Sequence, residues 1–212
     1  MKTLWRSALA LAVLLVSVVA GAAADLTLPP RPAKSGVDLV TALEQRRTTR
    51  EFAATALSLE DLSAILWAAN GMNRPDGRRT APTARNRQYI EIYLVGDAGA
   101  WRYDAAGHAL VTVTEANVKD RMAQQAHVAA ASHVLVLAAD LARVPSPDEA
   151  TRLGWAHSTA GAIAENVHLM AAARGIGTGM VAGIKADEIR RALGLPSESV
   201  PLYVMPLGHL KR

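Results

Sequence analysis

Residues 133–175 read HVLVLAADLARVPSPDEATRLGWAHSTAGAIAENVHLMAAARG, and they indicate how the chain folds. The first part, from His133 to Ala139, is an uninterrupted apolar run, which is typical of a strand buried on both faces. Residues 146–149, Ser-Pro-Asp-Glu, form a capping box with proline at the first helical position, so they predict the start of a helix. That helix should be long, ending near Arg174, with Gly175 as its C-terminal cap. The stretch therefore combines one deeply buried strand with one long helix.

On both sides of this stretch the predicted elements are shorter. Residues 58–61, Ser-Leu-Glu-Asp, form a second capping box, and the apolar stripe that follows predicts a helix ended by Gly71. Helices and isolated strands alternate without regular strand-helix-strand spacing, which points to an α+β domain with a small sheet between helical layers. The other predicted elements are helices over 37–46, 114–131 and 185–193, strands over 89–95, 101–104, 109–113 and 201–206, and a glycine-rich connection over 177–183.

The first 24 residues resemble a secretory signal peptide. Lys2 and Arg6 give a basic start, an apolar run follows from Ala8 to Ala20, and Ala22-x-Ala24 offers a cleavage site before Asp25. An uncleaved membrane anchor is the alternative, although the run is shorter than the roughly 20 apolar residues that a span needs. The sequence thus predicts an exported, periplasmic protein with no stable membrane span after cleavage.

Composition narrows the function classes that remain. Residues 25–36 carry three prolines and predict an extended arm, which leaves residues 37–212 as the predicted domain. Cleavage removes Lys2 and Arg6 and so lowers the formal net charge from +4 to +2, which gives no reason to expect nucleic-acid binding. The chain has no cysteine, which excludes disulfides, a thiolate nucleophile and zinc-cysteine sites.

The segment Arg46-Arg47-Thr48-Thr49-Arg50, at the end of the first predicted helix, is a candidate anion-binding site. Guanidinium groups match phosphate oxygens with two parallel hydrogen bonds, and threonine hydroxyls add further donors. A solvated basic turn is the alternative, and the segment taken alone favours neither interpretation.

Two loops are further candidates. Residues 79–88 form a proline-containing loop of small and amide residues before a predicted strand, and residues 175–183 carry four glycines. Glycine lets backbone N–H groups approach a ligand closely. Taken alone, the first loop is more simply a turn and the second a helix cap followed by a turn. The second is no dinucleotide fingerprint, because it does not follow a strand and open a helix.

Considered together, these segments resemble the nitroreductase-like FMN oxidoreductase family. Residues 46–52, RRTTREF, are similar to the family's Arg-Arg-Ser-x-Arg-x-Phe motif, and residues 79–84, RTAPTA, to its Arg-Thr-x-Pro-Ser-Ala loop. Residues 161–177 resemble its long central helix with a Gly-Leu-Gly-Thr end, and residues 206–208 its closing Pro-x-Gly. Residues 91–95 have the form seen in the branch that includes thiazoline and oxazoline dehydrogenases. The resemblance covers the whole predicted domain and implies three layers: a small, mostly antiparallel sheet flanked by helices.

The resemblance also implies an FMN site at the interface of a homodimer. The arginine-rich segment would hold the phosphate and ribityl oxygens, the proline loop would line the flavin, and backbone groups of the glycine-rich loop would face the ring edge. A late phosphate contact would come from the end of the chain. Arg85 departs from the family pattern, because it stands where glycine is frequent, and it would either crowd the site or add a charge to it. The implied FMN-binding residues are Arg46, Arg47, Thr48 and Arg50, then Pro82, Thr83, Ala84 and Asn86, then Val181, Ala182 and Gly183, and finally Arg212.

The implied activity is two-electron (hydride) transfer through FMN, from a small-molecule donor to a nitroaromatic, quinone or similar acceptor. FMN performs the redox chemistry, so no catalytic side chain is assigned. An exported flavin-binding or interaction protein without turnover, and a flavin dehydrogenase that oxidises azolines, are the alternatives. His157 and His168 share one helix face but lie about 16 Å apart, too far to hold one ion, so no metal site is predicted.

Overall fold

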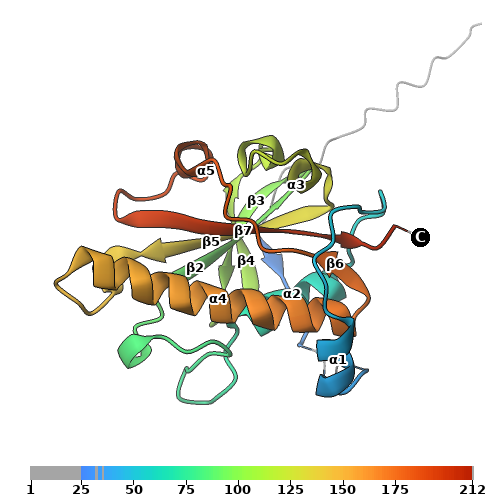
Figure 1. Ribbon diagram of the computed structural model, residues 1–212, viewed down its shortest axis with the longest axis horizontal. Coiled ribbons are helices and arrows are strands. Elements are labelled where there is room, and N and C mark those ends of the chain that lie inside the picture. Colours follow the sequence, from blue (N-terminus) through green and yellow to red (C-terminus); the bar gives the residue numbers. More distant parts are fainter. Residues whose placement is uncertain (1–24, 32, 35, 212) are drawn as a thin grey trace, which may run out of the picture.

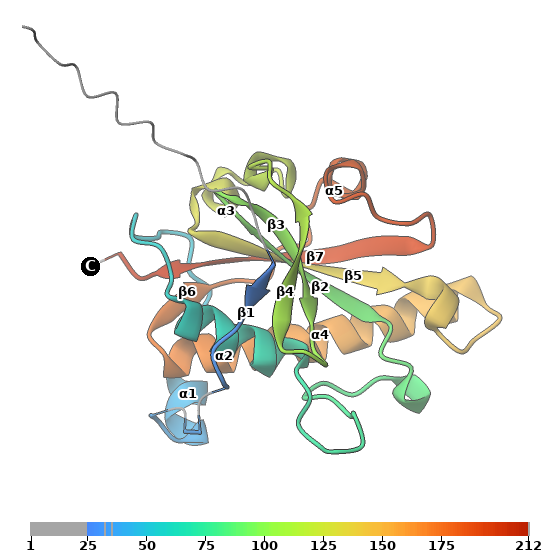
Figure 2. The same ribbon diagram turned by 180° about the vertical axis from the view of Figure 1, so that it is seen from behind.

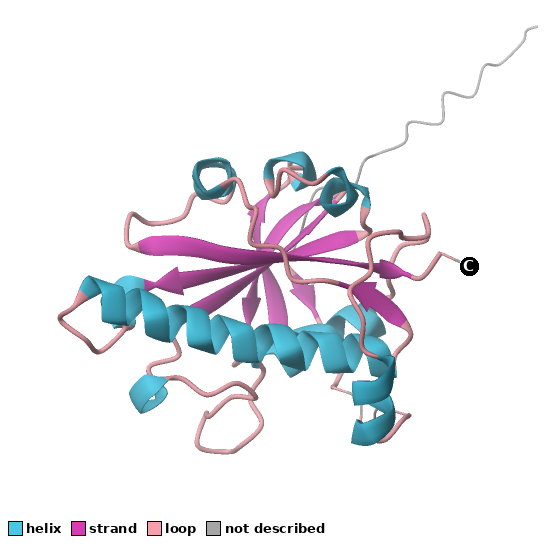
Figure 3. Cartoon of the chain, in the orientation of Figure 1, coloured by secondary structure: helices cyan, strands magenta, loops and turns pink. Residues whose placement is uncertain are grey.

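The strand predicted at residues 133–139 lies in the interior of a seven-stranded sheet. A computed structural model of the chain describes residues 25–31, 33–34 and 36–211, so the predicted signal peptide and Arg212 lie outside the described residues. Neighbouring strands pair antiparallel, in the order β1-β4-β3-β2-β5-β7-β6. Figure 3 shows the strands of this sheet in magenta, between helices in cyan. The strands are β1 (Leu26–Thr27), β2 (Ile90–Gly96), β3 (Gly99–Asp104), β4 (Ala109–Thr114), β5 (His133–Asp140), β6 (Ile176–Thr178) and β7 (Ser199–His209).

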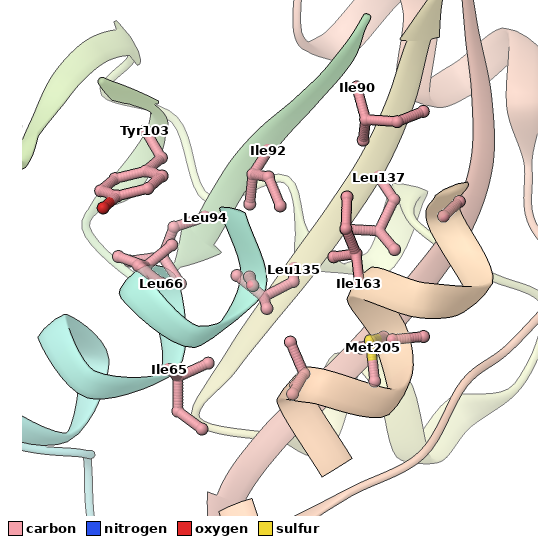
Figure 4. Packing of buried hydrophobic residues seen from close by; sticks show 14 of the residues in the cluster. Ile65, Leu66, Ile90, Ile92, Leu94, Tyr103, Leu135, Leu137, Ile163 and Met205 are labelled. Atoms are coloured by element: carbon pink, nitrogen blue, oxygen red, sulfur yellow. The ribbon is translucent and has the colours of Figure 1, made fainter. Parts of the chain in front are cut away.

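The sequence of β5 explains why the sheet is covered on both faces. Successive side chains of a strand point to opposite faces, and here both sets are apolar. Leu135 and Leu137 enter one buried cluster, and Val134 and Val136 enter a second cluster on the other face. Figure 4 shows Leu135 and Leu137 beside Ile163, which belongs to the long helix that covers the first face. A strand of this composition is stable only between two layers.

Helices form those two outer layers (Figures 1 and 2). The long α4 (Glu149–Ala173), α2 (Leu59–Asn70) and α1 (Leu39–Gln45) lie on one side of the sheet, and α3 (Ala126–Ala130) and α5 (Ala186–Ala192) lie on the other. The predicted three-layer α+β class is therefore confirmed. In the part of the chain that the structure describes, no helix has the length and apolar character of a membrane span. Three single-turn helices complete the fold: η1 (Ala84–Asn86), η2 (Lys119–Arg121) and η3 (Leu141–Arg143).

Local capping signals set most helix ends, with one correction. The Ser58 side chain accepts the Asp61 N–H at 3.1 Å and starts α2, as predicted. The first residue of α4 differs from the prediction, because its cap is the Asp148 carboxylate, which accepts the Thr151 N–H at 2.6 Å. Ser146 instead accepts the Asp148 N–H at 3.3 Å and forms a turn before the helix.

The helix predicted over residues 114–131 is wrong for most of its length. Within it the structure has only a single turn at Lys119–Arg121 and the five residues of α3. The reason is local: the Thr114 hydroxyl accepts the Ala116 N–H at 3.2 Å, and the Asn117 side chain accepts the Lys119 N–H at 3.2 Å. Such side-chain turns compete with helical hydrogen bonds.

Glycine and proline obscured the ends of one predicted strand and the whole of another strand. β7 runs from Ser199 to His209, beyond the predicted 201–206, and β6 occupies part of the predicted connection at 177–183. Gly177 of β6 pairs with Gly208 of β7. Because glycine has a weak strand propensity, the sequence pattern gives no sign of this pairing.

His133, at the start of β5, makes the stability of the fold depend on pH. Its ring packs against the backbone of Gly96, and its Nδ1 lies 2.9 Å from the Ser132 hydroxyl. Burial lowers the pKa of His133 from 6.5 to about 4, Lys119 adds to the lowering, and Asp97 opposes it. The folded protein therefore holds this ring neutral where the unfolded chain protonates it.

We expect acidification to destabilise the protein between pH 6.5 and about 4, because in that window the unfolded chain binds a proton that folded His133 does not. The expected loss in unfolding free energy is on the order of 3 kcal/mol for this group, since each pKa unit corresponds to about 1.4 kcal/mol. Urea denaturation across that pH range measures it. His133→Gln should reduce the pH dependence, and an equally steep loss in the variant would contradict this assignment.

Candidate functional site

The segment Arg46 to Arg50 leaves α1 and crosses the edge of the sheet in an extended conformation. Thr48 forms a parallel bridge with Thr178 of β6, and the Thr49 N–H donates to the Thr178 carbonyl at 2.7 Å. Alternate side chains of an extended segment point in opposite directions. The side chains of Arg46, Thr48 and Arg50 therefore point to one side of the segment, and those of Arg47 and Thr49 point to the other.

Glycines let this segment lie directly on the strands. A Cβ atom placed on Gly177 would lie 2.8 Å from Cγ2 of Thr49, and one on Gly208 would lie 3.0 Å from Cδ1 of Phe52. A Cβ atom on Gly179 would lie 2.8 Å from Cγ2 of Thr48. The backbone of the glycine-rich loop is thus held close to the arginine-rich segment, as a shared binding site requires.

The cations of the segment are only weakly neutralised. Arg46 Nε lies 3.9 Å from the Glu165 carboxylate, and the Arg46 side chain is partly exposed. Arg50 is exposed and makes no hydrogen bond or ion pair with any other described residue. Burial lowers the pKa of His127 in α3, and the Arg50 charge lowers it further. Two guanidinium groups are therefore available at this edge of the sheet, with α3 facing them.

Backbone donors are available beside these cations. The backbone groups of Val181 are already paired, because its N–H donates to the Val204 carbonyl at 2.9 Å and its carbonyl accepts the Val204 N–H. Within the described residues, the N–H groups of Ala182 and Gly183 make no hydrogen bond. The Gln125 side chain packs so closely on Gly183 that a Cβ atom there would lie 2.6 Å from its Nε2. Ala182 and Gly183 thus present two free amides on a constrained turn.

The loop that carries Pro82, Thr83, Ala84 and Asn86 lies elsewhere in the chain. The Pro82 carbonyl accepts the Thr159 hydroxyl of α4 at 3.2 Å, whereas Arg47 lines a cavity with Ala172 of the same helix. From Thr159 to Ala172, α4 rises about 20 Å. Both views show the loop apart from the arginine-rich segment (Figures 1 and 2). One chain therefore does not bring together the two halves of the predicted FMN site.

A cavity of about 120 Å³ lies behind the arginine-rich segment. Arg47 and Thr49 line it from one side, and His168 and Thr178 from the other. The Thr178 hydroxyl and His168 Nε2 are buried without a hydrogen bond to other described residues, whereas His168 Nδ1 lies 3.5 Å from the Glu165 carboxylate. Burial lowers the pKa of His168, and the Glu165 charge opposes the shift. Sequence reasoning missed this cavity, because its walls come from segments more than 100 residues apart and no local pattern marks them. His157 lies elsewhere and contacts the Tyr203 hydroxyl at 2.9 Å.

A larger open pocket, of about 480 Å³, lies over the proline loop. Sequence analysis assigned no site to residues 74–78, although five arginines stand between positions 74 and 87. Predicted flavin-lining residues and arginines share its wall. The pocket is lined by Arg74, Arg78, Arg79, Ala81, Pro82, Thr83, Arg85 and Asn86.

A third pocket, of about 330 Å³ between α1, α2 and α4, has mainly apolar walls and contains none of the predicted FMN residues. Beside it, α1 exposes 65% of Leu39, 63% of Val40 and 51% of Leu43. On α4, Gly154 and Gly161 have open space where a side chain would begin. An exposed apolar face with small residues on the neighbouring helix suits close packing against another helical surface.

Comparison with known proteins gives a consistent result. Residues 43–209 match the family described as "Nitroreductase family". The chain is 32% identical over 182 residues to a Methanocaldococcus jannaschii protein described as a "putative nitroreductase", covering 81% of this chain and 91% of that protein.

Two solved structures extend the comparison. A "putative nitroreductase" from Ralstonia eutropha superimposes with a TM-score of 0.85 at 30% identity, covering 92% of each chain. The NADPH:FMN oxidoreductase of Vibrio harveyi, solved with NAD+, superimposes with a TM-score of 0.62, covering 82% of this chain and 69% of that chain. At 23% identity, the second similarity is one of fold alone.

Proposed function

Because the chain belongs to the nitroreductase family, whose members are flavin-dependent oxidoreductases, we propose that it is an exported FMN-dependent oxidoreductase. It would transfer two electrons, as a hydride equivalent, from a small-molecule donor to a nitroaromatic, quinone or similar acceptor. The observation that carries the proposal is the pair of free amides at Ala182 and Gly183 beside the exposed Arg50 and weakly paired Arg46.

The residues of this edge fit FMN. Arg46 and Arg50, together with the exposed Thr48, would hold the phosphate and ribityl oxygens. A guanidinium group can donate two parallel hydrogen bonds to the oxygens of one phosphate. The free N–H groups of Ala182 and Gly183 would donate to the polar edge of the ring. FMN, when bound, supplies the hydride chemistry, so these residues bind and orient rather than react.

A homodimer would complete the site. Family members are typically dimers, and the Pro82 loop lies too far from Arg46 to line the same flavin within one chain. The exposed apolar side chains of α1 and the open positions Gly154 and Gly161 of α4 offer a face for the second copy. The proposal therefore pairs the arginine-rich segment of one subunit with the proline loop of the other.

Export remains part of the proposal and constrains the electron donor. The signal-like residues 1–24 support it. Family members usually draw on NADH or NADPH, which are scarce outside the cytoplasm. An exported member would therefore need another donor, and it would have to acquire FMN after crossing the membrane.

We expect the purified mature protein to be yellow and to release FMN, identified by mass spectrometry. A reductant should bleach the flavin, and a quinone or nitroaromatic should restore the colour within seconds. A flavin that bleaches but reoxidises no faster with an acceptor than without one would identify a binding protein without turnover. A protein that stays colourless after incubation with FMN would contradict both functions.

A further inference from the structure

The loop between residues 74 and 87 carries an unusual excess of positive charge. It contains five arginines and one carboxylate, Asp76, which pairs with Arg78 at 3.4 Å. Arg143 adds a sixth guanidinium, because its Nη2 donates to the Arg87 carbonyl at 3.0 Å. Like charges gathered in one place destabilise a protein unless solvent or a counter-ion screens them.

These arginines are arranged around a hollow. Four of them line the open pocket of about 480 Å³ over the proline loop. One of the four, Arg79, also lines a neighbouring pocket with Tyr103, Asp104 and Arg143, and its Nε is buried without a hydrogen-bond partner among the described residues. Burial lowers the pKa of Arg79, the charge of Arg143 lowers it further, and Tyr103 and Asp104 oppose the shift. The other three arginines of the pocket, Arg74, Arg78 and Arg85, are exposed, so their guanidinium groups are accessible to an anion that enters it.

The loop is held in shape rather than left free. Arg85, Asn86 and Gln88 adopt left-handed backbone conformations, with φ of 52°, 53° and 49°. The Gln88 N–H donates to the Thr83 hydroxyl at 2.9 Å, and the Gln88 side chain donates to the Gly77 carbonyl at 2.9 Å. Glycine would fit position 85 without strain, yet the chain carries an arginine there. Strained, fixed backbone of this kind gathers at ligand sites.

We propose that this pocket binds a small planar molecule with two anionic groups, such as an aromatic dicarboxylate or an aryl phosphate. The inference rests on the proposed function for its role, because Pro82, Thr83 and Asn86 of the flavin-lining loop also line the pocket. A bound dianion thus lies beside the redox site as the acceptor substrate. When that acceptor is a nitroarene, its nitro group takes two electrons from the reduced flavin and two protons, becomes a nitroso group and loses water.

The concave shape favours a small molecule over an acidic protein. A pocket of this size matches ligands of one or two rings, which bury most of their surface in such a site. Arginine forks give bidentate recognition of carboxylate and phosphate groups. The resulting ligand class is an anionic aromatic, in place of the neutral quinones and nitroarenes that the family resemblance allows.

The test compares 5-nitroisophthalate, a dianion, with its neutral diamide, using the FMN-loaded mature protein. By titration calorimetry with oxidised enzyme, we expect the dianion to bind at least about tenfold more tightly than the diamide, with the difference shrinking at high salt. Phenyl phosphate, titrated in parallel, shows which anionic group the pocket prefers. The double variant Arg78→Gln, Arg85→Gln should abolish most of the tenfold preference. The loop should keep its shape in this variant, because neither side chain donates a hydrogen bond to another described residue of the loop.

The matched control is Arg121→Gln, Arg191→Gln, which removes the same charge at exposed positions outside the pocket. It should keep the preference within about twofold. Equal binding of dianion and diamide to the wild type, an unchanged preference in the pocket variant, or an equal loss in the control would overturn the proposal. Loss of FMN from the pocket variant would also overturn the proposal, because it would show that Arg78 and Arg85 bind the cofactor. Calorimetry tests anion binding to the pocket, whereas the absorbance spectrum tests FMN binding and turnover. The further inference can therefore be contradicted while the proposed function stands.

Discussion

Replacing both Arg46 and Arg50 by glutamine should weaken FMN binding by at least about a hundredfold while leaving the fold intact. Each charge-assisted hydrogen bond contributes roughly 1.5–3 kcal/mol, and two are removed. Folding should tolerate the change, because Arg50 makes no hydrogen bond or ion pair within the described residues and Arg46 has only a 3.9 Å contact with Glu165. Fluorescence titration of the apoprotein with FMN measures the affinity, and circular dichroism checks the fold.

Two single variants sharpen this test. Arg191→Gln, on the exposed face of α5, removes one charge away from the site and should leave the affinity unchanged. Arg47→Gln distinguishes the family resemblance from the observed geometry, because Arg47 lines the cavity behind the segment. We expect Arg47→Gln to change FMN affinity less than about threefold. Such a change corresponds to much less free energy than the loss of a bidentate interaction with the phosphate. A loss comparable to that of the Arg46 and Arg50 double variant would show that Arg47 does bind the phosphate.

Replacing Gly177 by valine should destabilise the protein by about 3 kcal/mol and also remove FMN binding. Valine suits a strand, so the penalty comes only from contact: its Cβ would lie 2.8 Å from Cγ2 of Thr49 and 3.1 Å from Cδ2 of Leu210. The clash would push the arginine-rich segment off β6. Urea denaturation and FMN titration report the two effects.

A second substitution provides the control for this contact. Thr49→Ser removes the Cγ2 atom and keeps the hydroxyl, so in the Gly177→Val background it should recover part of the lost stability. Alone, Thr49→Ser should cost less than about 1 kcal/mol, the scale of one methyl group. If the serine variant restores nothing, the clash does not arise from this contact.

The elements that sequence analysis predicts well are those whose signals are local. The apolar run of β5 predicts a buried strand, and the capping serine of α2 predicts a helix start, each from only a few consecutive residues. The helix predicted over 114–131 fails because Thr114 and Asn117 bond to nearby backbone, a competition that the apolar pattern does not reveal. The pairing of Gly177 with Gly208 needs the tertiary structure, since neither residue favours a strand.

The same distinction applies to the candidate site. The arginines of residues 46–50 stand together in the sequence, so their grouping was predictable. Their directions were not, because Arg47 turns toward His168 only after the segment pairs extended against β6. Val181 was assigned to the ring edge, yet its hydrogen bonds go to Val204. Long-range pairing decides which backbone groups remain free, and no local motif encodes it.

The place of β7 between β5 and β6 has a consequence for biogenesis. β7 is synthesised after every other strand of the sheet, yet it joins two strands in the sheet and carries the glycine on which Phe52 rests. Until it emerges, one edge of β5 is open and the arginine-rich segment lacks its complete support. Such late, long-range closure makes folding slow. A nascent chain built in this order therefore cannot complete its sheet, or the support of the arginine-rich segment, until its last residues have been made.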